Sequence, residues 1–398
     1  MKILIHDYNK DEWEKVSPAY QGWKVIADDG NIKPCMGCFG CWIKDPGQCV
    51  IKDGYETIGA MIHLAEEVLV ISRYTYGCFS SFIKNIMDRS ISGVLPFFEI
   101  IDGEMHHKRR YAEKMPMRFI FRGSGLTDAD KEKAKAYVEA VCRNFHADIL
   151  GIGFEECGQL SNDNAAEASR NDADEKTVQA AGEENDKKVL IINCSMRGNN
   201  ANTKRFLDYL VQSIDAETES INLASYIKKE DEMAGLMASA DRIVLGMPLY
   251  VDGVPSQALR IMEKAEKCTL ISGKKIYVVA NMGFYESSQI KNLLSQVRSW
   301  CEVCGSVYGG GIAIGAGEMM GKVMNMSSTK GGPGRNMMIA LEKLGGIVSA
   351  DDCIDDIYAD AHGFTRSLYM MAANAGWPAD AKKNGLKKKD LMQRRSPG

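Results

Sequence analysis

The most informative stretch of this 398-residue chain is Lys188-Val189-Leu190-Ile191-Ile192-Asn193-Cys194-Ser195-Met196-Arg197-Gly198-Asn199-Asn200-Ala201-Asn202-Thr203. Its aliphatic run predicts a strand that is buried on both faces of a parallel sheet. After the polar loop, we expect an amphipathic helix from Lys204 to Ile214. A strand that enters a helix through such a loop points backbone N–H groups and the helix dipole at one place, which suits a phosphate. The stretch therefore predicts an α/β fold with an anion site.

Several side chains of this loop could bind the phosphate directly. Ser195, Asn202 and Thr203 would give short hydrogen bonds, and Arg197 would add a charge-assisted one. The alternative is an ordinary helix N-cap, for which Asn and Thr are also preferred. An N-cap needs only one such residue, whereas this loop offers several, so phosphate binding is favoured.

The two halves of the chain repeat one plan. Residues 2–7 open the first half in the same way as residues 188–193 open the second, with a basic residue before an aliphatic run. Strands and helices then alternate, which predicts right-handed βαβ units and a parallel sheet covered on both faces. We expect further strands at 67–72, 117–121 and 149–153 and a helix at 79–89 in the first half, and strands at 241–246, 275–281 and 310–314 and a helix at 256–267 in the second. The predicted fold class is α/β, with two tandem doubly wound parallel-sheet domains that arose by internal duplication.

The domain boundary follows from a change in composition. Residues 161–186 consist almost wholly of Asn, Asp, Glu, Ala, Ser and Lys, and such a segment buries too little apolar surface to order itself. The predicted division is a first domain at 1–158, a flexible linker at 159–187, a second domain at 188–365 and a helical, basic tail at 366–398. A marginal Ala/Glu helix is the alternative for the linker.

Composition excludes some classes of partner. The formal net charge is −4, with 45% apolar and 26% charged residues, so no nucleic acid or membrane partner is expected. The apolar runs are strand-sized and the N-terminus does not resemble a signal peptide. Twelve cysteines without a secretion signal indicate a reducing cytoplasm, where thiols bind metals or take part in redox chemistry.

Four of these cysteines lie close together, at Cys35, Cys38, Cys41 and Cys49. Two C-x-x-C steps that share a cysteine are a known way to hold an iron–sulfur cluster. Four thiolates also make a closed tetrahedral zinc site. The simplest alternative is a patch of buried, reduced thiols in a tight turn. The spacing favours a metal or redox role and does not choose between iron and zinc.

The second half resembles the flavodoxin-like, NAD(P)H-dependent FMN reductases. Its phosphate loop is similar to that family's, although Cys194 stands where the family usually has a glycine. Residues 247–252 resemble the second flavin loop, and residues 281–285 fall where the third would be. The resemblance implies a flavin site made of Ser195, Arg197, Asn199, Asn202, Thr203, Pro248, Leu249, Tyr250, Val251, Asn281, Met282, Gly283 and Phe284.

The first half resembles the same family, but it has the cysteine run and lacks the phosphate loop. Its cysteine run resembles the motif of iron–sulfur flavoproteins, in which four cysteines hold a 4Fe–4S cluster beside FMN. The segment after its first strand does not match a phosphate loop. The acidic residues there, Asp11, Glu12 and Glu14, would repel a phosphate. We therefore expect a metal or dithiol centre in the first domain and the flavin in the second. Efficient electron exchange requires the two centres to face each other, within one chain or across a dimer.

The resemblance implies a cytoplasmic FMN oxidoreductase. It would take electrons from NAD(P)H and pass them to a small-molecule or protein acceptor, and a homodimer is expected. The alternative is a non-enzymatic electron carrier, or a degenerate scaffold with a structural zinc or thiol site.

Three segments outside these motifs carry smaller expectations. The insertion at 91–115, which contains His106 and His107, is expected to be a solvated loop, with a lid or a dimer contact as the alternative. The tail at 382–395 is expected to be a solvated helix end, with docking on a partner through Trp377, Met370 and Met371 as the alternative. Cys301 and Cys304 are expected to pack on a core at the end of a helix, with a redox pair as the alternative.

Overall fold

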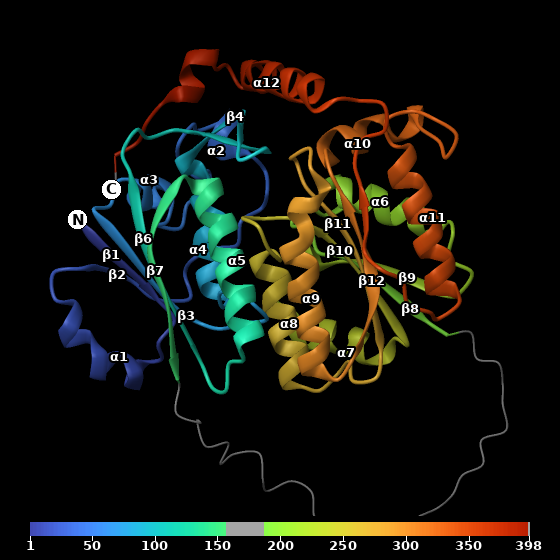
Figure 1. Ribbon diagram of the computed structural model, residues 1–398, viewed down its shortest axis with the longest axis horizontal. Helices are drawn as coiled ribbons and strands as arrows, with labels where there is room; N and C mark the ends of the chain where they lie inside the picture. The colour runs from blue at the N-terminus through green and yellow to red at the C-terminus, as the bar shows by residue number, and fades with distance from the viewer. Residues whose placement is uncertain (157–186, 397–398) are drawn as a thin grey trace, which may run out of the picture.

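The computed structural model describes residues 1–156 and 187–396, which form two parallel sheets, each covered by helices (Figure 1). Nearly all of the predicted linker, from 159 to 186, lies outside the described residues. Each sheet has its own hydrophobic core. None of the helices in the described ranges is both long and apolar enough to cross a membrane.

The first sheet has the strand order β2-β1-β3-β6-β7, and every neighbouring pair is parallel. The elements of this half, in chain order, are β1 (Lys2–His6), α1 (Lys10–Val16), η1 (Ser17–Tyr20), β2 (Lys24–Ile26), α2 (Gly40–Ile43), α3 (Ile58–His63), β3 (Glu67–Arg73), α4 (Ser81–Arg89), η2 (Ser90–Gly93), β4 (Val94–Ile101), β5 (Glu104–Arg109), β6 (Met115–Gly123), α5 (Asp128–Phe145) and β7 (Ala147–Glu156).

The second sheet has the order β13-β12-β11-β10-β8-β9, again with parallel neighbours. Its elements are β8 (Val189–Asn193), η3 (Gly198–Asn200), α6 (Asn202–Val211), β9 (Thr218–Asn222), η4 (Leu223–Ser225), α7 (Glu230–Ser239), β10 (Arg242–Pro248), α8 (Ser256–Lys267), β11 (Lys275–Asn281), η5 (Ser287–Ile290), α9 (Lys291–Cys304), β12 (Val307–Ile314), α10 (Gly317–Val323), η6 (Met324–Met326), α11 (Arg335–Ser349) and β13 (Ile357–Ala359). Two further elements follow, α12 (Arg366–Lys383) and η7 (Lys388–Met392).

Both sheets have the same topology. If the main strands of each half are numbered along the chain, their order in space is 2-1-3-4-5, which is the order of flavodoxin-like folds. In such sheets the ligand crevice lies at the carboxyl ends of strands 1 and 3, where the direction of winding changes. In the second half these strands are β8 and β10, and the predicted phosphate loop leaves the end of β8. The predicted fold class is confirmed.

The insertion at 91–115 is not a solvated loop. It contains the antiparallel hairpin β4–β5, whose residues Leu95, Phe97, Phe98 and Met105 are buried. Asp102 and Gly103 form the turn, and both have positive φ. The hairpin packs against α12 (Figure 1), and its residues Phe98 and His107 line the cavity described below.

The C-terminal segment is also packed, contrary to the expectation of a solvated helix end. From the second half, α12 crosses to the first half, and η7 lies against the hairpin (Figure 1). Leu391 is fully buried beside Leu95 and Phe97. The guanidinium of Arg110 donates to the carbonyl oxygens of Leu391 (2.9 Å) and Gln393 (2.6 Å). The basic tail therefore binds within its own chain.

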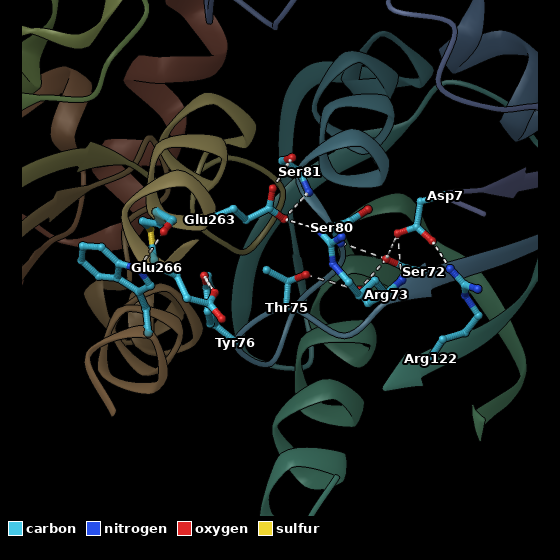
Figure 2. Close-up of polar contacts among 12 residues, drawn as sticks. Asp7, Ser72, Arg73, Thr75, Tyr76, Ser80, Ser81, Arg122, Glu263 and Glu266 are labelled. Atoms are coloured by element: carbon cyan, nitrogen blue, oxygen red, sulfur yellow. Dashed lines mark hydrogen bonds and ion pairs between the residues drawn. The ribbon is translucent and has the colours of Figure 1, made fainter. Parts of the chain in front are cut away.

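The two halves meet through equivalent helices, α4 from the first and α8 from the second. Figure 2 shows one side of this contact, where Glu263 of α8 accepts from Arg73 (2.9 Å) and from the hydroxyl of Ser81 (2.8 Å). On the other side Asp88 of α4, which pairs with Lys84 of the same helix, accepts from the backbone N–H of Ser256 of α8 (3.0 Å). Such matched faces resemble the isologous interface of a two-fold dimer.

Candidate functional site

A cavity of about 710 Å³ lies between the two halves at the carboxyl ends of the second sheet. Its size is within the range of about 300–1,000 Å³ that is typical of small-molecule sites. Residues from both halves line it, including all four cysteines of the first half and twelve of the thirteen predicted flavin residues of the second. The structure therefore brings the two sets of motifs together inside one chain.

The phosphate loop forms one end of this cavity. It begins where β8 ends at Asn193, and α6 starts at Asn202 with Ala201 as its N-cap residue. The methyl side chain of Ala201 cannot accept a hydrogen bond, so it leaves the first N–H groups of α6 for another acceptor. The loop therefore does not serve as an ordinary side-chain N-cap.

Four of the five predicted phosphate ligands lie in the cavity wall, and the fifth does not. Ser195, Arg197, Asn202 and Thr203 line the cavity. Asn199 lies outside its lining, and its amide oxygen accepts from Asn222 Nδ2 (2.8 Å) at the end of β9.

Two cations reach this end of the cavity. Arg197 pairs with Glu318 of α10 (2.8 Å), and its guanidinium lies over the ring of Phe39, 5.5 Å from the centroid. Lys322, one helical turn after Glu318, also lines the cavity. Sequence reasoning missed Lys322 and Glu318, because no local motif marks α10 as part of the wall.

The two predicted ring loops are held against each other. The backbone N–H of Leu249 donates to Asn281 O (2.7 Å), and the hydroxyl of Thr203 donates to Asn281 Oδ1 (2.6 Å). All eight predicted ring residues line the cavity: Pro248, Leu249, Tyr250, Val251, Asn281, Met282, Gly283 and Phe284. The phosphate loop and both ring loops thus surround one space.

The loop at residues 247–252, the second flavin loop of the sequence analysis and called the second ring loop below, contains a strained turn. Tyr250 and Gly253 exchange backbone hydrogen bonds, and Val251 and Asp252 between them have φ of 39° and 58°. A β-branched residue with positive φ is an outlier, and such strain is concentrated at functional sites. The first half has the same turn between Thr75 and Cys78.

The cysteine run forms the opposite wall. Cys41 and Cys49 are buried, Cys35 is half-buried and Cys38 is exposed. The hydroxyl of Tyr250 occupies the space beside Gly37: a Cβ built there would lie 1.9 Å from the oxygen. The second ring loop and the cysteine run are therefore in direct contact.

Two of these thiols, Cys35 and Cys41, have a raised pKa and are protonated at neutral pH. Burial and, to a smaller extent, the charge of Asp88 together raise the pKa of Cys35 to about 12. Burial also raises the pKa of Cys41 well above its ordinary value, with repulsion from Cys35, Cys49 and Cys38 added.

The thiols are not arranged as a metal site. Within residues 1–156 and 187–396, no three or more His, Cys, Asp or Glu side chains are assembled to hold a metal ion. The arrangement fits four reduced thiols and does not fit a 4Fe–4S cluster or zinc. A metal bound by these cysteines stays a prediction that the structure does not support.

Two parts of the wall were not predicted from the sequence. The helix α12 contributes Ala373, Gly376 and Trp377, and Trp377 packs edge-on against Phe39 and Trp42 of the cysteine run. The hairpin contributes His107, whose ring lies 5.2 Å from that of Phe284.

The equivalent position in the first half is filled by protein. After β1, the carboxylate of Asp7 accepts from the N–H of Arg73 (2.8 Å) and pairs with Arg122 (3.3 Å) (Figure 2). Asn9 and Glu12 then form a capping box at the start of α1. A carboxylate therefore occupies the end of β1, where the second half has its phosphate loop.

Cys301 and Cys304 are buried in the second core near the end of α9, as expected.

Comparison with solved structures gives matches to single domains of this kind. An FMN-dependent NADH-azoreductase from Bacillus anthracis, solved in complex with FMN, is 14% identical and covers 41% of this chain and 100% of its own, with a TM-score of 0.30. An NADPH-quinone reductase from P. pentosaceus is 14% identical and covers 40% of this chain and 97% of its own, with a TM-score of 0.32. A WrbA-like flavodoxin from Agrobacterium tumefaciens is 13% identical and covers 42% and 96%, with a TM-score of 0.30.

Searches of protein-family models and of curated proteins found no match. Structural similarity at these TM-scores does not assign a function to the chain. Each half has the flavodoxin-like strand order.

Proposed function

We propose that the chain is an FMN-dependent oxidoreductase that takes electrons from NAD(P)H and passes them to a small-molecule or protein acceptor. The observation that supports it is the cavity at the ends of β8 and β10, which the phosphate loop and both ring loops line together. When bound, the flavin would accept a hydride from the nicotinamide and release the electrons to an acceptor.

The residues present fit FMN in charge and polarity. At one end, the open N-terminus of α6 and the cations Arg197 and Lys322 would hold the phosphate. Glu318 balances part of this charge through its ion pair with Arg197. Along the cavity, Tyr250, Phe284, Trp42 and Trp377 would offer apolar surface to a planar ring and would help to exclude water from it.

The cysteine wall adds a second redox element to the proposal. Its thiols line the cavity that would hold the flavin, and Tyr250 of the second ring loop contacts Gly37 of the cysteine run. A thiol centre there would exchange electrons with the flavin without movement of the two halves. Iron and zinc analysis of protein made anaerobically tests whether a metal joins them.

The test of function is turnover by the flavin-loaded protein. We expect the purified chain, incubated with FMN and desalted, to be yellow and to oxidise NADH or NADPH in the presence of a quinone. A colourless protein that keeps stoichiometric zinc and oxidises neither nucleotide would contradict the proposal and favour a scaffold. Flavin that is retained but is not reduced by either nucleotide would instead indicate an electron carrier.

A further inference from the structure

Asp252 places a buried carboxyl group in the cavity wall. It belongs to the strained turn of the second ring loop, where its φ is 58°, and its side chain is only 3% exposed. A buried carboxylate is costly unless it is paired or protonated. Nothing in the proposed binding of FMN requires an acid at this position.

A chain of polar side chains connects Asp252 to the surface. Asn144 Nδ2 of α5 donates to Asp252 Oδ2 (2.7 Å), and Asn144 Oδ1 accepts from His106 Nδ1 of β5 (2.8 Å). His106 Nε2 lies 3.6 Å from the carboxylate of Glu104, which is 30% exposed. Asn144 also lines the cavity, so this chain fixes the carboxyl group where the cavity wall and the hairpin meet.

The titratable groups near Asp252 lie on three elements. Lys84 lies on α4, Glu104 and His106 on β5, and Tyr137 and Cys142 on α5. Lys84 is already paired with Asp88, so its charge is largely balanced. Burial is the dominant influence and raises the pKa of Asp252 above its ordinary value. The group therefore keeps its proton at a pH where an exposed aspartate has lost it.

We propose that Asp252 donates the proton that an acceptor needs in a two-electron reduction, an inference that rests on the function proposed above. In the reduction of a quinone, bound flavin would supply both electrons to the quinone as a hydride. The O–H bond of Asp252 breaks, and its proton goes to the quinone oxygen that gains negative charge. The product is the hydroquinone, and the Asp252 carboxylate regains a proton from water when the product leaves.

The test separates proton-dependent from proton-independent acceptors. The full chain loaded with FMN is reduced with dithionite and mixed anaerobically with either 1,4-benzoquinone or ferricyanide, which takes single electrons and no proton. Asp252→Asn keeps the size, the left-handed turn and an acceptor for Asn144. The matched control is Asp102→Asn, at a turn residue with φ of 50° whose side chain is 74% exposed and lies outside the cavity lining.

We expect Asp252→Asn to slow flavin oxidation by benzoquinone by about 100-fold, since general acid catalysis typically contributes at least that much. Oxidation by ferricyanide should change by less than about two-fold, and Asp102→Asn should match the native chain with both. In the native chain the benzoquinone rate should fall as pH rises above the pKa of Asp252, and the variant should lack this decline.

An Asp252→Asn variant that keeps the native benzoquinone rate, or that slows equally with both acceptors, overturns the inference and leaves the proposed function standing. If the native chain holds no FMN, the proposed function fails and the inference falls with it.

Discussion

Gly37 shows how one residue fits the two halves together. It has a φ of 60°, which favours glycine, and the hydroxyl of Tyr250 fills the space where a side chain would begin. The contact joins the cysteine run to the second ring loop, so a larger residue must push these two walls apart.

We therefore expect Gly37→Ala to destabilise the fold more than a matched substitution elsewhere. The control is Gly54→Ala, at a φ of 87° with open space around the position, which carries the cost of backbone strain alone. Urea unfolding of both variants should show a further loss of about 1–3 kcal/mol for Gly37→Ala, as in other overpacked sites. Equal losses in the two variants would mean that Tyr250 moves aside freely.

His63 predicts a dependence of stability on pH. It is buried between Tyr111 and Phe145, and burial lowers its pKa to about 4. The unfolded chain, with an ordinary histidine pKa of about 6.5, binds more protons in this window. The stabilisation is thus complete above pH 6.5 and is lost as pH falls towards 4.

The expected size of this loss is about 3 kcal/mol, because one unit of pKa corresponds to about 1.4 kcal/mol. Urea unfolding at pH 7 and pH 4.5 measures it, with His63→Met as the control that cannot titrate. His6 and His107, whose pKa values burial also lowers, would still titrate in that control. If the native chain and His63→Met lose equal stability between the two pH values, His63 does not contribute.

At the scale of single elements, continuous apolar runs were predicted best. The helix α8 and the strand β11 have the bounds expected from the sequence, whereas α6 begins two residues earlier, at Asn202. The hairpin β4–β5 was missed, although Asp102-Gly103 is a strong hairpin turn signal between apolar residues. Adjacent charged and histidine residues in β5 hid that signal by suggesting a solvated segment.

The phosphate loop can be tested as an element. We expect Arg197→Ala with Thr203→Ala to remove most of the bound FMN, since hydrogen bonds to a charged group contribute about 1.5–3 kcal/mol each. Asn199→Ala is the control, because Asn199 lies in the same loop but outside the cavity lining. Its affinity for FMN, measured by fluorescence quenching, should change at most a few-fold. Unchanged affinity in the double variant would rule out this loop as the phosphate site.

The C-terminal segment depends on Arg110. This guanidinium is 3% exposed and donates to four carbonyl oxygens, two of them in the segment after η7 begins. Arg110→Ala should remove the hydrogen bonds to the carbonyl oxygens of Leu391 and Gln393 and release the segment, so trypsin should cut the basic tail within minutes. The neighbouring Arg109→Ala changes an exposed side chain and should leave the tail protected. Protection of the tail in both variants would refute this role of Arg110.

At the scale of the whole molecule, the pairing of the halves was beyond sequence reasoning. Each sheet follows from local hydrophobic patterns, and the requirement that the thiols face the flavin loops was expected. The contacts that achieve it, such as Glu263 with Ser81, join residues far apart in the chain and leave no periodic signal (Figure 2). The contribution of α12 to the cavity lining was not predicted, for the same reason.

The paired halves have two equivalent positions for a ligand, and only one is open. Asp7 and Arg122 fill the position at the end of β1, whereas the end of β8 opens into the cavity. The predicted homodimer stays a prediction.

The most direct test of this account is the number of FMN molecules that one chain binds, measured by calorimetric titration of the flavin-free protein. We predict one FMN per chain, with the heat of binding abolished in the Arg197→Ala/Thr203→Ala variant. Two molecules per chain, or none, would contradict the assignment of a single flavin site to the cavity between the halves.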